Sequence, residues 1–204
     1  MTKQVSYRER ILEYAKEKFF KHGFKKVTMD ELAAEMHMSK KTIYKFFPSK
    51  HILIESVIEK QIVDTTDAYN KIIHAHLDYI ERLYNLWMLI GKNYVIFGKT
   101  YQGELRTYDY ALWKQVEEIR KTVFDNFLSF LSEGIFTRVI RSDFRKEVIL
   151  PSYLGALRGV IHESDIAQYS FSVNEVLSTI STMIFEGMLS DTGKRQFRFF
   201  NNKR

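Results

Sequence analysis

Apolar residues recur at helical spacing along most of the chain. Ile11, Ala15 and Phe19 repeat every four positions, which gives a first helix one apolar face, and His22-Gly23 can end that helix. Helical patterns continue from about residue 72 to 133, from Leu150 to Ile166, and from Ser172 to Leu189. Because no alternating pattern of convincing length predicts a β-strand, the sequence predicts an all-α fold.

Three Ser/Thr-x-x-Glu pairs predict where helices begin. Each is a capping box, in which the side chain of either residue can accept a hydrogen bond from the backbone N–H of the other. The pairs are Ser6 with Glu9, Thr28 with Glu31, and Ser172 with Glu175.

Residues 28 to 50 predict two short helices joined by a sharp turn. Thr28 can cap the first helix and Ser39 the second, and the linker His37-Met38 has room only for a sharp turn. Pro48 stops the second helix, and Ser49 is placed to cap the next one. This arrangement is a helix-turn-helix, which predicts a protein that binds DNA in a sequence-specific way. The residues expected to face inward are Leu32, Ala33, Met36, Ile43, Phe46 and Phe47.

The helix that starts near Ser49 has no stop signal until about Asp67. We therefore expect it to connect an N-terminal three-helix domain, residues 1–50, with a larger helical bundle, residues 51–204. Within that bundle the sequence predicts interruptions near Gly91, near Gly98, at 101–103 and at 134–143.

Charge separates the same two parts of the chain. Residues 1–50 carry 12 Lys/Arg and six Asp/Glu, a net charge of +6, whereas the other 154 residues carry 19 of each. These 154 residues therefore have no net charge. The last eleven of them carry a net charge of +5, so residues 51–193 carry a net charge of −5. A basic head on an acidic body fits a polyanionic partner that is bound at one end. The basic tail could contact the acidic body, contact a partner, or be disordered.

Composition predicts a soluble, cytoplasmic protein. The chain has no cysteine and no apolar N-terminal segment typical of a signal peptide. The longest stretches without a charged residue are only ten residues long, far short of the ~20 needed to cross a bilayer.

Enzyme chemistry has little support in the sequence. The spacing of His74 and His76 places the two imidazoles on different sides of a helix, which disfavours a shared metal ion. The chain lacks a glycine-rich phosphate loop, a nucleophile elbow and a cysteine nucleophile. We expect no catalytic site, no metal site and no cofactor.

Residues 6–58 resemble the TetR family of bacterial transcriptional regulators. The resemblance lies in Gly23-Phe24, in Thr28, and in the run Ser39-x-x-Thr42-Ile43-Tyr44-x-x-Phe47-x-Ser49-Lys50-x-x-Leu53. It implies a homodimer with two DNA-binding heads and a helical body that binds a small effector, which releases the protein from its operator. Two positions depart from the family: His37 stands where a glycine is common, and Lys41 where a small residue is common.

Chemistry assigns the head residues two kinds of DNA contact. Lysine can reach guanine or a phosphate, threonine can touch a thymine methyl, and a tyrosine phenol suits a phosphate oxygen. Thr28 and Lys50 lie at helix N-termini, where the helix dipole favours an anion, and are expected to clamp the backbone. The candidate DNA-binding residues are Thr28, Ser39, Lys40, Lys41, Thr42, Tyr44, Lys45 and Lys50.

The last helical pair is the candidate dimer interface. Small residues let a partner helix approach closely, and an apolar stripe on the next helix can complete an intermolecular four-helix bundle. The alternative is that both surfaces pack only within one chain. The candidate residues are Gly155, Gly159, Leu177, Ile180, Ile184 and Met188.

An aromatic-rich segment, residues 79–130, is the candidate effector site. Aromatic side chains could line a pocket for an apolar or aromatic molecule, or they could simply form the core. The candidate residues are Tyr84, Trp87, Tyr94, Tyr110, Trp113 and Phe127. The sequence thus predicts a repressor that an effector releases from a palindromic operator, and the alternative is a constitutive architectural DNA-binding protein without an effector.

Overall fold

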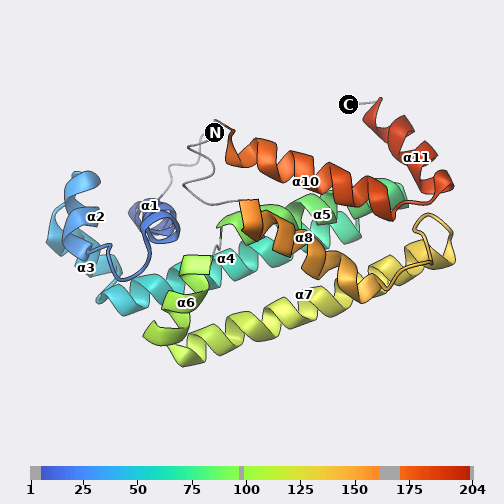
Figure 1. Cartoon of the computed structure of the whole chain (residues 1–204). Coiled ribbons are helices and arrows are strands. Elements are labelled where there is room, and N and C mark those ends of the chain that lie inside the picture. The colour runs from blue at the N-terminus through green and yellow to red at the C-terminus, as the bar shows by residue number, and fades with distance from the viewer. Residues whose placement is uncertain (1–5, 97–98, 161–170, 203–204) are drawn as a thin grey trace. The chain divides into compact units, whose positions relative to one another are not determined.

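The computed structural model describes residues 6–96, 99–160 and 171–202, and all regular secondary structure in these ranges is helical (Figure 1). The predicted all-α fold is therefore confirmed. The helices are α1 Tyr7–His22, α2 Met29–Glu35, α3 Lys40–Phe46, α4 Lys50–Ile73, α5 Tyr79–Ile96, α6 Lys99–Tyr108, α7 Tyr110–Phe136, α8 Lys146–Val160, α10 Val173–Met188 and α11 Asp191–Asn201.

The chain forms two compact units. The first unit comprises residues 1–66 and 97–116, and the second comprises residues 67–96 and 117–204. The first unit therefore contains α1 to α3, most of α4, α6 and the start of α7. As the sequence predicts, α4 continues well beyond the three-helix head, whereas the boundary at residue 50 stays a prediction.

The predicted helix starts are confirmed by their caps. The side chains of Ser6, Thr28 and Ser172 each accept a hydrogen bond from the backbone N–H three residues later. In all three cases the glutamate completes the capping box. Gly23 caps the end of α1 with φ of 86°, a conformation that favours glycine.

The first unit has a core of its own. The inward faces of α1 and α3 meet there, with Phe19, Ile43 and Phe47 almost completely buried. Leu105 of α6 and Leu112 of α7 belong to the same cluster. The head is therefore packed together with helices that lie farther along the chain.

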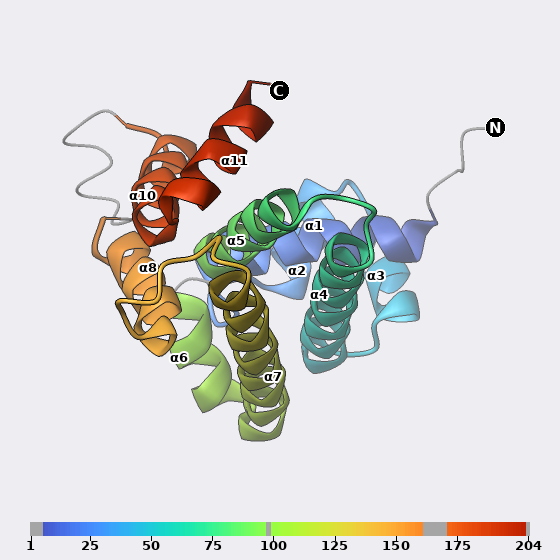
Figure 2. The ribbon, with the colours of Figure 1, turned by 90° about the vertical axis from the view of Figure 1, so that its right-hand side faces the viewer.

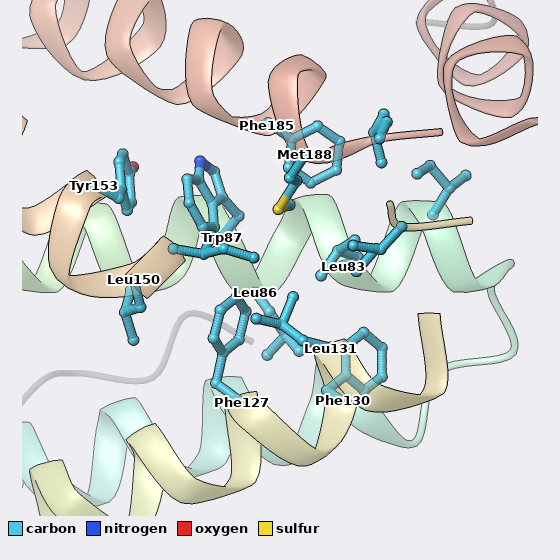
Figure 3. Packing of buried hydrophobic residues seen from close by; sticks show 14 of the residues in the cluster. Leu83, Leu86, Trp87, Phe127, Phe130, Leu131, Leu150, Tyr153, Phe185 and Met188 are labelled. Atoms are coloured by element: carbon cyan, nitrogen blue, oxygen red, sulfur yellow. The ribbon is translucent and has the colours of Figure 1, made fainter. Parts of the chain in front are cut away.

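The second unit is built around aromatic side chains. Trp87 of α5 stacks on Tyr153 of α8, with ring centroids 4.0 Å apart, and contacts Phe127 of α7 and Phe185 of α10 (Figure 3). α10 packs on both α8 and α5 (Figures 1 and 2).

The basic tail forms a helix, which the sequence did not predict. In α11, Phe197 and Phe200 are buried in the second unit and contact Tyr84 of α5. Ser190 caps this helix through the backbone N–H of Gly193. The tail is thus part of the fold of the second unit as far as Asn202.

Two predicted interruptions are wrong. α5 runs without a break through Gly91, and α6 runs through Gly103. The break between α7 and α8 is confirmed, although α8 begins at Lys146 and includes Pro151. Gly98 and the predicted helix end at Ile166 lie outside the described residues.

None of the described helices is long and apolar enough to cross a membrane.

Candidate nucleic-acid interface

The helix-turn-helix is formed by α2, a tight turn and α3. Met36 ends α2, and His37 follows with φ of 54°, in the left-handed region. The backbone N–H of Met38 donates to the carbonyl of Ala33, which closes the turn. His37 thus directly follows a helix end in the left-handed region, a position where glycine is usual.

The two faces of α3 differ sharply. Ile43 is fully buried against α1 and α2, which fixes the helix on the head. Lys41, Tyr44 and Lys45, at positions i, i+3 and i+4, form the exposed stripe. Neither lysine makes an ion pair with any described residue, so both ammonium groups are free to meet an anion.

Other candidate residues of α3 also have local structural roles. Ser39 caps the helix by accepting from the backbone N–H of Thr42, and the two hydroxyl oxygens are 2.8 Å apart. Lys40 forms an ion pair with Asp30 of α2, which partly neutralises its charge. Ser39, Lys40 and Thr42 therefore stabilise the head itself, whether or not they also contact DNA.

The two candidate backbone clamps differ in their surroundings. Thr28 is exposed and uses its hydroxyl oxygen to cap α2, so its hydroxyl hydrogen can still be donated to a phosphate. The Lys50 ammonium lies 3.4 Å from the carbonyl oxygen of Lys25. Partial burial lowers the pKa of the Lys50 ammonium. Lys50 thus joins the start of α4 to the loop between α1 and α2.

Two cations near the interface were not among the predicted residues. Lys25 and Lys26 are exposed in the loop just before Thr28. The signal available in the sequence is a lysine doublet two residues before a capping threonine.

Arg8 of α1 places its guanidinium 5.1 Å from the centre of the Phe47 ring, which links the first turn of α1 to the end of α3.

The candidate effector residues fall into both units. Tyr84, Trp87, Tyr94 and Phe127 belong to the aromatic core of the second unit, where Trp87 and Phe127 are fully buried. Tyr110 and Trp113 belong to the first unit, and Tyr110 is largely exposed. The structure therefore does not group the six residues within one unit.

The second unit also contains a cavity of about 370 Å³ between the start of α5, the residues that follow α7, and α11. None of the six candidate effector residues lines it. The lining residues are Asp78, Tyr79, Ile80, Glu81, Thr137, Val139, Gln196, Phe199 and Phe200.

The candidate dimer residues also divide into two sets. Leu177 and Met188 are buried inside the protomer, so they belong to its own core. Gly155 and Gly159 are not packed by any described residue, because a Cβ atom built on either one meets no described atom within 4 Å. Ile180 and Ile184 remain partly exposed on α10.

Comparison with known proteins identifies the head. Residues 11–57 match the model of bacterial regulatory proteins of the tetR family. The uncharacterised HTH-type transcriptional regulator YvaF of Bacillus subtilis is 25% identical over 165 residues, which cover 80% of this chain and 86% of that protein.

Solved structures share the fold of nearly the whole chain. The ketosteroid transcriptional regulator KstR2 of Mycobacterium tuberculosis is 17% identical and has a TM-score of 0.70, covering 92% of this chain and 98% of its own. A TetR-like transcriptional regulator from Rhodococcus sp. RHA1 is 21% identical and has a TM-score of 0.60, covering 90% of this chain and 96% of its own.

The matched segment is the segment that carries the helix-turn-helix and its exposed basic stripe. Residues 11–57 are therefore a DNA-binding domain of the tetR family of bacterial regulatory proteins, and most of the chain is similar to transcriptional regulators.

Proposed function

We propose that the protein is a homodimeric repressor that reads a palindromic operator with α3 and leaves it when a small effector binds the second unit. The observation that carries the proposal is the exposed stripe of α3. Lys41, Tyr44 and Lys45 project from a helix whose opposite face is fixed by the buried Ile43. A rigid helix with unpaired cations on its outer face suits the major groove of DNA.

The stripe divides the DNA contacts into two roles. Lys41 and Lys45 are proposed to read base edges, since each can reach guanine O6 and N7. Tyr44 and Thr28 are proposed to contact phosphates, and Lys50 to hold the loop that precedes Thr28. Phosphate contacts position the head on any DNA, whereas base contacts select the site.

Variants of the stripe test this division. Lys45→Ala should lower affinity for the operator by roughly 1–3 kcal/mol if the contact is bidentate, with a smaller loss on random DNA. Thr28→Ala should weaken binding to both DNAs about equally. Lys121→Ala, which removes an exposed cation of α7 in the second unit, is the matched control and should bind like the parent protein. Equal losses on operator and random DNA for Lys41→Ala and Lys45→Ala would contradict the proposal and favour a constitutive architectural protein.

Dimerisation is proposed to use the open faces of α8 and α10. On α8, Val148, Ser152, Gly155 and Gly159 follow one side of the helix, and none of them is buried in the protomer. On α10, the corresponding stripe consists of Ile180, Met183, Ile184 and Gly187, and Met183 is 70% exposed. Small and apolar residues on two adjacent helices suit an intermolecular four-helix bundle.

A charge placed in this stripe tests the dimer. Met183→Glu should convert the protein into a monomer in sedimentation velocity, because the carboxylate would be buried without a partner. Val63→Glu, an equally drastic change at an exposed position of α4, should leave the dimer intact. A monomeric parent protein, or a dimeric Met183→Glu variant, would contradict the proposed interface.

The effector is proposed to be apolar or aromatic and to bind the aromatic core of the second unit. Tyr84, Trp87, Tyr94 and Phe127 supply that surface. Binding can release DNA only if the effector prefers the conformation that fits the operator less well.

A further inference from the structure

Three polar side chains lie inside the otherwise apolar core of the second unit. Trp87 of α5, Tyr153 of α8 and Ser181 of α10 each have no exposed surface. The side chains around them, including Phe127, Leu177 and Phe185, are apolar. We call these three residues the polar trio.

Within the described part of the chain, the hydrogen bonds of the polar trio leave donors unused. The hydroxyls of Tyr153 and Ser181 are 2.6 Å apart, and either can donate to the other. Whichever hydroxyl donates, the other keeps its own hydrogen. The indole Nε1–H of Trp87 is buried and has no acceptor among the described residues. Because a buried donor without an acceptor costs about 1–3 kcal/mol, such a group calls for a functional explanation.

The geometry brings these donors to one place. Trp87 and Tyr153 are stacked, and Figure 3 shows the indole nitrogen and the Tyr153 oxygen at the ends of the rings that face α10. Gly91, one turn after Trp87, permits this position of the phenol, since a Cβ there would lie 2.0 Å from the Tyr153 oxygen.

The chemistry of the trio selects the ligand. Burial raises the pKa of the Tyr153 phenol to about 12, so the phenol stays a neutral donor at physiological pH. No charged side chain is buried in the described part of the chain, so an ionised ligand would lack a buried counter-charge. A neutral oxygen acceptor can take both the indole N–H and the remaining hydroxyl hydrogen.

We propose that the polar trio binds the carbonyl oxygen of a small apolar or aromatic ketone or ester, whose hydrocarbon part packs among Phe127, Leu177 and Phe185. The inference rests on the proposed function, because this ligand would be the effector. It goes further by assigning Trp87, Tyr153 and Ser181 as the residues that distinguish a carbonyl compound from a hydrocarbon of the same shape.

The test uses the indole N–H signals of the full-length protein labelled with ¹⁵N. The chain has two tryptophans, so Trp113→Phe assigns the Trp87 signal and also serves as the control variant, because Trp113 lies in the other unit. Acetophenone is the probe, and ethylbenzene, which lacks the oxygen, is the matched hydrocarbon. Acetophenone should move the Trp87 indole proton downfield, as expected for a new hydrogen bond, and ethylbenzene should not.

Variants then separate the hydrogen bonds from the packing. Trp87→Phe and Tyr153→Phe should each weaken acetophenone binding roughly three- to tenfold, the effect of one hydrogen bond, with little change for ethylbenzene. Ser181→Ala provides a third, smaller change if a tryptophan variant unfolds. The proposal is overturned if acetophenone does not shift the Trp87 signal, or if the variants bind both compounds as the parent protein does.

DNA affinity is measured separately with the same probe. Binding at Trp87 without any loss of operator affinity would support the polar trio as a ligand site and contradict effector release. Operator release by a compound that leaves the Trp87 signal unchanged would support the proposed function and overturn this site.

Discussion

His37 has a backbone conformation that most side chains avoid. Its φ of 54° is imposed by the turn between α2 and α3, where the chain must reverse within two residues. Histidine tolerates the left-handed region better than β-branched residues do. This backbone conformation is nevertheless strained for histidine, whereas it is not strained for glycine.

We therefore expect His37→Gly to increase the free energy of unfolding by about 0.5–1 kcal/mol, the backbone strain relieved minus the extra chain entropy of glycine. Chemical denaturation measures this change. His37→Ala is the matched control, since it removes the imidazole but keeps the Cβ atom, and it should give no gain. Equal effects of the two substitutions would show that backbone strain is not the cause.

Gly91 and Gly103 differ in how closely other side chains pack against them. Both lie inside helices, yet only Gly91 is packed, because a Cβ atom there would lie 2.7 Å from the Cδ1 of Leu177 as well as against Tyr153. A Cβ atom at Gly103 would meet no atom of the described residues within 4 Å.

Gly91→Ala should therefore lower the free energy of unfolding by about 1–3 kcal/mol through overpacking. Gly103→Ala should raise it by about 0.5–1 kcal/mol through helix propensity. Thermal and denaturant unfolding of the two variants measure both changes, and the same sign for both would refute the packing described for α5.

At the scale of elements, α1 and α2 are joined by one carboxylate. Glu35 of α2 accepts a hydrogen bond from the Tyr14 hydroxyl at 2.6 Å and forms an ion pair with Lys18 at 2.7 Å. The hydrogen bonds from Lys18 and Tyr14 lower the pKa of the Glu35 carboxyl below its ordinary value.

A lowered carboxyl pKa fixes how this contact depends on pH. Its contribution to stability is complete above the pKa of glutamate in the unfolded chain and is lost as the pH falls through the lowered pKa in the folded protein. Glu35→Gln should therefore be less stable than the parent protein between roughly pH 5 and pH 8, and the difference should shrink below about pH 4. Glu55→Gln, at an exposed position of α4 without an ion pair among the described residues, should show no such trend. A difference that persists unchanged at low pH would rule out an ionic origin.

Local signals in the sequence predicted several elements correctly. The capping boxes at Ser6, Thr28 and Ser172 depend on residues three positions apart, so they can be recognised without knowledge of the fold. The stripe at Lys41 and Lys45 follows in the same way from helical spacing.

Contacts between distant parts of the sequence could not be predicted in this way. Packing can hold a glycine inside a helix, as it does at Gly91, which is packed by Tyr153, 62 residues away in the sequence. The apolar face of α11 was not recognised in the sequence, because basic residues surround Phe197 and Phe200. The pairing of Lys40 with Asp30 likewise depends on how α2 and α3 pack.

At the scale of the whole molecule, the charge distribution and the proposed symmetry lead to one expectation. Residues 1–50 carry a net charge of +6, and a dimer would present two such heads to DNA. A two-fold symmetric protein binds a palindromic site most tightly, with half-sites about one helical turn, ~34 Å, or a multiple of it apart. Neutralisation of several phosphates also makes the affinity fall with salt concentration.

The most direct measurement is the selection of bound duplexes from a random DNA pool by the purified protein, followed by titration of the selected duplex at several salt concentrations. We expect a palindromic consensus that binds at least ~10³-fold more tightly than random DNA at the same salt concentration. A pool without a consensus, with an affinity set by salt concentration alone, would contradict the account of a dimeric, sequence-specific regulator.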